Sequence, residues 1–300
     1  MMEGEPAAIL VTGATGQIGQ ALVKRLLAAN GPVVALCHRH RIPNSAPGLT
    51  WVNGDLADDQ VDFGTRKIDR LVHATGLWLL PRHLPALRAL GVRRIVAFGS
   101  TSIFGKVESG SRFEKGQISA INEAAQDLVE QCSKLEVDWT ILRPTLTYGV
   151  GIDRNISAAA RFIDRFGFYP ISGSASGLRQ PVHADDLAAA SVLALAAPTT
   201  AGRSYDLGGG ETLLYREMIG RIFDVLGRPR RFISVPLLGP LVGVWGWMSG
   251  NSELNSEVVS RMNRDLVFDH GDAAGDFGYA PRNFLADGRA DLGVERSRSR

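Results

Sequence analysis

Three glycines near the N-terminus have the spacing of a phosphate-binding turn. Residues 11–19 read VTGATGQIG, which places Gly13, Gly16 and Gly19 three residues apart. Glycines let a chain turn sharply, let backbone N–H groups approach a pyrophosphate and let a helix pack closely on a strand. The N-terminus of the next helix would face the phosphates with its partial positive charge. The spacing predicts a dinucleotide-binding turn, and a purely structural turn is the alternative.

Hydroxyl side chains in the middle of the chain form a second group of residues that could take part in catalysis. Ser100, Thr101 and Ser102 directly follow an apolar run that ends near Phe98. A serine is a poor base at neutral pH and needs a neighbouring group. His73 ends another apolar run, and in a parallel sheet both runs would end at the ligand-binding edge. We therefore predict Ser100, Thr101 and His73 as catalytic residues. The alternatives are hydroxyls that cap a strand end and a histidine satisfied within the fold.

Apolar runs and helical patterns alternate through the first half of the chain. The predicted strands are 8–11, 33–36, 49–52, 71–74, 94–98 and 139–142. The predicted helices between them are 18–28, 84–90 and 120–135. Strands separated by helices pair in parallel through right-handed crossovers. The predicted fold class is therefore α/β, a Rossmann-type doubly wound parallel sheet.

The alternation loosens after Pro144, where further helical patterns cover 156–166, 184–196 and 213–226. We expect residues 1–150 to form the dinucleotide-binding domain, with residues 180–208 returning to it. The rest is expected to be a smaller, mostly helical substrate-binding region, at 151–179 and 209–285, and a tail at 286–300.

The composition excludes several classes of protein. Of 300 residues, 45% are hydrophobic and 21% charged, and the net charge of +2 gives no case for a nucleic-acid partner. Only Cys37 and Cys132 are cysteines, so no cysteine-rich metal site is predicted. The first residues lack a basic segment followed by an apolar one, so a cytoplasmic location is expected.

The longest uncharged apolar stretch covers residues 232–248 and is shorter than the roughly 20 residues of a membrane span. One interpretation is a buried or half-buried helix. The other is a surface that binds an apolar substrate or a membrane. Trp245 and Trp247 favour this interpretation because tryptophan prefers interfaces.

Further motifs follow the glycine turn in a fixed order: GDL at 54–56, HATG at 73–76, FGSTSIFG at 98–105, RPTLTYG at 143–149 and QPVHADD at 180–186. Together they resemble the short-chain dehydrogenase/reductase superfamily, in its extended or atypical branch of epimerase and dehydratase relatives, over about residues 8–230. The resemblance implies that Ser100 is the active-site hydroxyl and that Asp55 contacts adenine. It implies a cofactor site made of Gly13, Thr15, Gly16, Gln17, Ile18, Gly19, His38, Arg39, Asp55, Leu56, Ala74, Thr75, Gly76 and Pro144.

The residues after the second predicted strand favour NADP over NAD. An NAD site places a carboxylate there to accept hydrogen bonds from the ribose. This chain instead reads CHRHR at 37–41, and Arg39 could grip a 2′-phosphate with a forked contact. NADP is therefore the favoured cofactor, and an ordinary basic loop with NAD as cofactor is the alternative.

The Tyr-x-x-x-Lys pair of this superfamily is absent. In relatives the lysine lowers the pKa of the tyrosine, whose phenolate then moves a proton. None of the five tyrosines has a lysine four residues later. Alignment on the following strand places Ile118 at the tyrosine position and Asn122 at the lysine position. Ser100 is the first candidate to replace them.

Two functions follow from this resemblance. The first is an NAD(P)-binding oxidoreductase or epimerase-like enzyme with a non-standard acid/base, acting on a nucleotide-linked or lipid-linked sugar. The second is a catalytically silent NADP(H)-binding sensor or scaffold. Arg154, Arg161 and Arg179 lie where relatives bind the diphosphate of a sugar nucleotide, although solvated surface charges are the alternative. A homodimer, common among relatives, is a further interpretation, and membrane contact would involve only residues 232–248.

Overall fold

The computed structural model describes residues 7–38, 46–64, 66–105, 110–236, 239–240 and 259–293. Arg39 and most of the apolar stretch at 232–248 lie outside the described residues.

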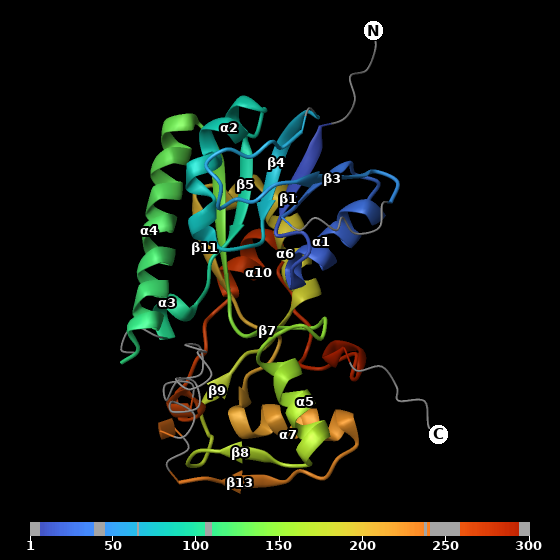
Figure 1. Ribbon diagram of the computed structural model, residues 1–300, viewed down its shortest axis with the longest axis vertical. Helices are drawn as coiled ribbons and strands as arrows, with labels where there is room; N and C mark the ends of the chain where they lie inside the picture. The colour runs from blue at the N-terminus through green and yellow to red at the C-terminus, as the bar shows by residue number, and fades with distance from the viewer. Residues whose placement is uncertain are drawn as a thin grey trace.

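A seven-stranded parallel sheet forms the upper lobe of the molecule (Figure 1). Its spatial order is β11-β6-β5-β4-β1-β2-β3. The strands are β1 Ala8–Thr12, β2 Val33–Cys37, β3 Leu49–Asn53, β4 Ile68–His73, β5 Arg94–Phe98, β6 Asp138–Pro144 and β11 Arg203–Leu207. Strand order reverses between β1 and β4, which confirms the doubly wound class. The six predicted strands are present, and β11 is the seventh.

Helices cover both faces of the sheet (Figure 1). On one face, α1 (Gln17–Ala28), α6 (Ala184–Ala196) and α10 (Gly271–Phe277) bury apolar side chains against the strands. On the other face, α2 (Leu84–Ala89) and α4 (Arg112–Leu135) do the same. Because both faces are covered, β1 and β2 are buried along their whole length, as the continuous apolar runs of a parallel sheet require.

The second lobe lies beyond the C-terminal edge of the sheet (Figure 1). Its helices α5 (Ile156–Phe166) and α7 (Tyr215–Leu226) pack against each other in one apolar cluster. Three short strand pairs complete it: β7 Thr147–Tyr148 with β10 Val182–His183, β8 Tyr169–Ile171 with β13 Phe232–Ser234, and β9 Leu178–Arg179 with β12 Leu213–Leu214.

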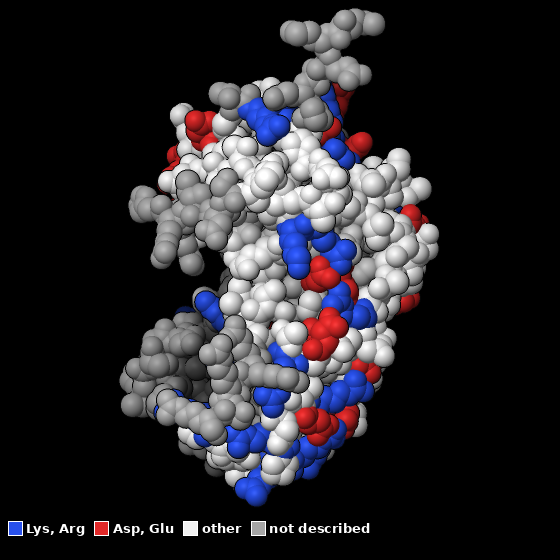
Figure 2. All heavy atoms as spheres, turned by 90° about the vertical axis from the view of Figure 1, so that its right-hand side faces the viewer, with Lys and Arg blue, Asp and Glu red and all other residues white. Residues whose placement is uncertain are grey.

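Short helical turns connect these elements: η1 Leu77–Leu79, η2 Pro81–His83, α3 Ser102–Gly105, η3 Pro198–Thr200, η4 Arg261–Asn263 and η5 Ala290–Leu292. Among the described residues, no helix has the length and apolar character needed to cross a membrane. On the face drawn in Figure 2, side chains of both charges lie next to one another, in keeping with the nearly balanced composition.

Candidate functional site

The glycine turn joins β1 to α1 and is crowded at its glycine positions. Gly13 has φ +72°, and a Cβ there would lie 2.5 Å from the carbonyl oxygen of Ala74. A Cβ on Gly19 would lie 2.1 Å from the oxygen of Gly13, so helix and strand touch through backbone alone. Gly16 is the N-cap of α1 and makes no side-chain cap, so the N–H groups of the first turn suit an anion.

Gln17 adds an orphan donor at the same helix end. Within the described part of the chain its Nε2 atom is buried and has no hydrogen-bond partner. An unpaired buried amide costs free energy unless a ligand or water accepts its hydrogen bond. The backbone of the glycine turn and the Gln17 amide therefore fit the phosphates of a dinucleotide.

The predicted cofactor residues follow neighbouring strands along one edge of the sheet. His38 follows β2 and is exposed, while Asp55 and Leu56 follow β3. Ala74, Thr75 and Gly76 follow β4, and the N–H of Ala74 donates to the oxygen of Thr12 at 3.0 Å. The loops of four strands thus meet beside the glycine turn, as the C-terminal edge of a doubly wound sheet requires.

Ser100 and Thr101 follow the end of β5 but have different surroundings. The Thr101 hydroxyl is buried and donates to the oxygen of Pro144 at 3.1 Å, which ties the end of β5 to β6. Ser100 Oγ accepts from the N–H of Ser102 at 3.1 Å, which leaves its own hydrogen to be donated. Both residues line the large cavity described below.

His73 is fully buried at the end of β4 and does not line that cavity. Its Nε2 lies 3.0 Å from the oxygen of Gly76 and donates to it, so Nδ1 accepts from the Thr12 hydroxyl at 2.8 Å. Burial lowers the pKa of His73 to about 4. Both ring nitrogens are satisfied within the fold, and this geometry does not support the prediction that His73 acts on a substrate.

A cavity of about 1240 Å³ lies between the two lobes. Its upper wall includes Gln17 of the glycine turn and Ser100 of the loop after β5, so it is continuous with the predicted cofactor site. Helix α4 contributes Phe113, Glu114 and Gln117. Ile118, aligned with the missing tyrosine, is not among the lining residues. The sequence reasoning missed Glu114 and Gln117, although their i, i+3 spacing places them on one helix face.

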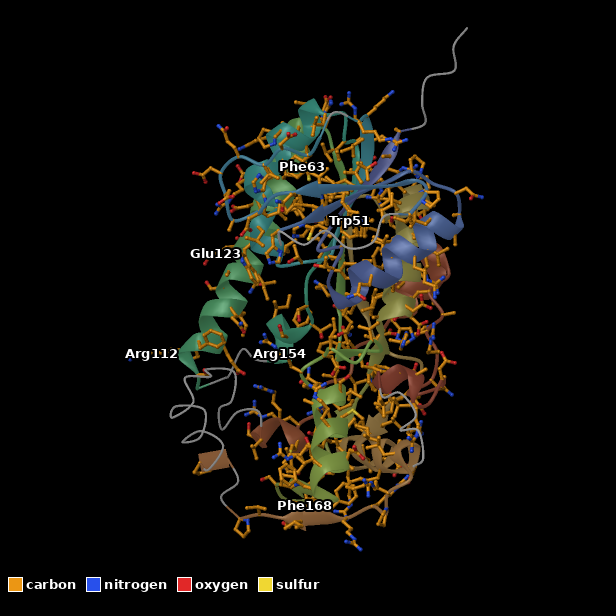
Figure 3. The ribbon with its side chains drawn as sticks, turned by 45° about the vertical axis from the view of Figure 1, so that its right-hand side comes forward. Trp51, Phe63, Arg112, Glu123, Arg154 and Phe168 are labelled. Carbon is orange, nitrogen blue, oxygen red and sulfur yellow. The ribbon has the colours of Figure 1, made fainter. Side chains whose placement is uncertain are left out.

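The three arginines predicted to bind a diphosphate differ in their exposure to solvent. Arg154 precedes α5 and Arg161 lies in its middle, and both are exposed and line the cavity. Arg154 lies between the two lobes (Figure 3). Arg179 is only 6% exposed. Its guanidinium donates to the oxygens of Leu178 and Arg264, each at 2.7 Å, and to that of Arg261.

Two half-buried tyrosines in the cavity wall were not predicted. Tyr169 of β8 and Tyr215 of α7 hold their hydroxyl oxygens 3.1 Å apart. Burial raises the pKa of both phenols, so both remain protonated at neutral pH. They can donate hydrogen bonds but do not supply a phenolate base.

Two other polar side chains hold the chain in place. His183 caps α6, accepting from the N–H of Asp185 at 3.1 Å. Asp185 pairs with Arg25 at 2.6 Å and with Arg282 at 2.7 Å. The Tyr148 hydroxyl is buried and accepts from the N–H of Leu285 at 3.0 Å. The contacts of Arg282 and Leu285 hold the C-terminal segment against α6 and β7.

Residues 13–150 match a family model described as NAD(P)H-binding. The chain is 24% identical over 318 residues to UDP-glucose 4-epimerase of Vibrio cholerae, covering 94% of this chain and 93% of the relative. It is 25% identical over 320 residues to 2-alkyl-3-oxoalkanoate reductase of Stenotrophomonas maltophilia, covering 93% and 96%. The solved dTDP-glucose 4,6-dehydratase of Streptomyces venezuelae superposes with a TM-score of 0.70 at 22% identity over 95% of each chain. These similarities confirm the predicted fold class and NAD(P)-binding region.

Proposed function

We propose that this chain is a member of the extended short-chain dehydrogenase/reductase superfamily and an NAD(P)-dependent oxidoreductase. It would exchange a hydride with a carbonyl or hydroxyl-bearing carbon of a small-molecule substrate. One observation carries the proposal: a single cavity is lined by Gln17 of the phosphate turn and by Ser100 of the strand end. Cofactor and substrate would therefore meet beside the Ser100 hydroxyl. The relatives named above are an epimerase and a reductase, which favours an enzyme over a silent sensor.

The dinucleotide would be held by the backbone of the glycine turn and by Gln17, with Asp55 near the adenine. When bound, its nicotinamide supplies or accepts the hydride. For the phosphorylated form, the support is the sequence after β2, where no carboxylate occurs and Arg39 could contact the 2′-phosphate.

Ser100 would donate a hydrogen bond to the oxygen of the reacting carbon. In the reductive direction this oxygen gains a proton while the carbon gains a hydride. With no Tyr-x-x-x-Lys pair in the chain, that proton would come from water in the cavity, passed through the Ser100 hydroxyl. Thr101 would hold the strand end in position through its bond to Pro144.

Calorimetric titration with NADPH, NADP, NADH and NAD tests the cofactor. We expect NADPH and NADP to bind more tightly than NADH and NAD. Arg39→Ala should reduce this preference at least tenfold. Gly16→Val should weaken the binding of all four dinucleotides at least tenfold, because a Cβ at this position would lie only 3.1 Å from the Gly13 oxygen. Gly31→Val is the matched control, since its Cβ would make only an ordinary 3.5 Å contact. Absence of binding to all four dinucleotides would overturn the proposed function.

A further inference from the structure

The part of the cavity far from the sheet is built mainly from apolar side chains. Helix α7 contributes Met218 and Ile219, α5 contributes Phe162, and the segment after residue 258 contributes Val259, Met262 and Leu266. Met218 and Ile219 are each 1% exposed, and Val259 and Met262 are 3% and 6% exposed, although all four border the cavity. Methionines are flexible and polarizable, and they adapt to apolar groups of irregular shape.

The cations deep in this cavity are already neutralised or saturated by protein groups. The Arg261 guanidinium makes two bonds of 2.9 Å to the Glu114 carboxylate. Arg179 donates to three backbone oxygens, and its guanidinium lies over the Tyr215 ring, 5.4 Å from the ring centre. A diphosphate placed here would have to displace these partners in a region of low dielectric, which is costly.

The rim of the cavity is more exposed to solvent than its interior. Arg154 and Arg161 are exposed there, and Arg161 also donates to the oxygen of Gly151 at 3.1 Å. An anionic group can bind at such a rim and remain partly hydrated. The cavity therefore offers a hydroxyl at one end, cations at the rim and an apolar wall in the interior.

From this arrangement we propose that the substrate is an amphiphile with an anionic head and an alkyl chain. The head, a carboxylate or a phosphate, binds at Arg154 and Arg161. The chain lies along Met218, Met262 and Leu266, and the reacting oxygen faces Ser100. This inference rests on the proposed function and names the substrate class of the same site.

The test is calorimetric titration of the NADP-loaded protein with 3-oxo fatty acids of six, eight, ten and twelve carbons, below their micellar concentrations. A buried CH₂ contributes about 0.8 kcal/mol, so Kd should fall by about fourfold per added carbon until the cavity is filled. Alkyl monophosphates of the same lengths distinguish a phosphate head from a carboxylate head. A Kd independent of chain length, or tighter binding of UDP-glucose than of any amphiphile, would overturn the inference.

Matched variants show whether the chain occupies this cavity. Leu266 is half-buried and lines the cavity, whereas its neighbour Val267 is 40% exposed and does not. We expect Leu266→Asn to reduce the gain in affinity per added carbon to less than twofold. Val267→Asn should leave this gain unchanged. Arg161→Gln should weaken every chain length by a similar factor of about five. Equal chain-length dependence in Leu266→Asn and wild type would place the chain elsewhere and overturn the inference.

The titration also separates this inference from the proposed function. If the protein binds NADP and the amphiphile series shows no chain-length effect, the substrate class is wrong and the cofactor proposal stands. If it binds none of the four dinucleotides, the proposed function fails, whatever the fatty acids do.

Discussion

Arg261 and Glu114 form a two-pronged ion pair across the cavity, with both N···O distances at 2.9 Å. Their side chains are 14% and 4% exposed. Glu114 lies in the first turn of α4, on the sheet-bearing lobe, and Arg261 lies 147 residues later in the segment that closes the far wall. The pair therefore fixes the spacing of two walls of the candidate site.

Removing one partner of this pair should be costly. Glu114→Ala leaves the Arg261 guanidinium without its carboxylate in a buried site, and such losses destabilise proteins by about 3 to 5 kcal/mol. Urea denaturation measures the change. The double variant Glu114→Met with Arg261→Met should recover more than half of the loss, because no charge is left buried. If the single variant matches wild type, the ion pair does not brace the cavity.

Two glycine-to-alanine substitutions should have opposite effects. Gly19→Ala forces a Cβ to within 2.1 Å of the Gly13 oxygen, and we expect a loss of more than 2 kcal/mol together with loss of dinucleotide binding. Gly116 lies within α4, and a Cβ there meets nothing within 4 Å. Gly116→Ala should therefore stabilise the chain by about 0.5 to 1 kcal/mol. Thermal unfolding with and without NADPH checks both, and a stable Gly19→Ala protein that binds cofactor would contradict the turn geometry.

Acid should destabilise the fold through His73. Its pKa is about 4 in the folded chain, because of burial, against an ordinary value of 6.5. The unfolded chain binds the proton more readily, so this stabilisation is complete above pH 6.5 and is lost as the pH falls towards 4. The loss is about 3 kcal/mol. His73→Gln should flatten this part of the curve of unfolding free energy against pH, and an unchanged slope in the variant would rule out His73 as the cause.

Ser100 and Thr101 should differ in what they affect. Ser100→Ala should lower kcat at least tenfold with any substrate that is turned over, and change stability by less than about 0.5 kcal/mol. Thr101→Val leaves the Pro144 oxygen without its hydroxyl donor, so we expect a stability loss of about 1 to 2 kcal/mol. Paired steady-state kinetics and denaturation distinguish the two. If both variants lose stability equally and Ser100→Ala keeps its kcat, Ser100 has a structural role only.

The local sequence pattern was sufficient to predict the six strands and the phosphate-binding turn. The six predicted strands each contain a short apolar run, and the two-sided parallel sheet buries β1 and β2 completely. The glycine spacing is equally local at Gly16 and Gly19, where a Cβ would crowd the Gly13 oxygen of the same turn, whereas a Cβ on Gly13 would meet Ala74 of a distant loop. The edge strand β11 escaped prediction because Arg203, Ser204 and Asp206 face a less buried environment and leave no continuous apolar run.

The rest of the site depends on contacts between residues far apart in the chain. The sequence indicated that His73 ends a strand. Only the tertiary structure showed that Thr12, 61 residues away, and the turn at Gly76 satisfy both ring nitrogens. It also joined Glu114 to Arg261 and Tyr169 to Tyr215, and it placed Gln117 rather than Ile118 on the cavity face of α4. Sequence alone determines periodicity and local turns, because these depend on neighbouring residues. Which buried polar groups find partners, and which face a cavity, is decided only when distant segments pack together.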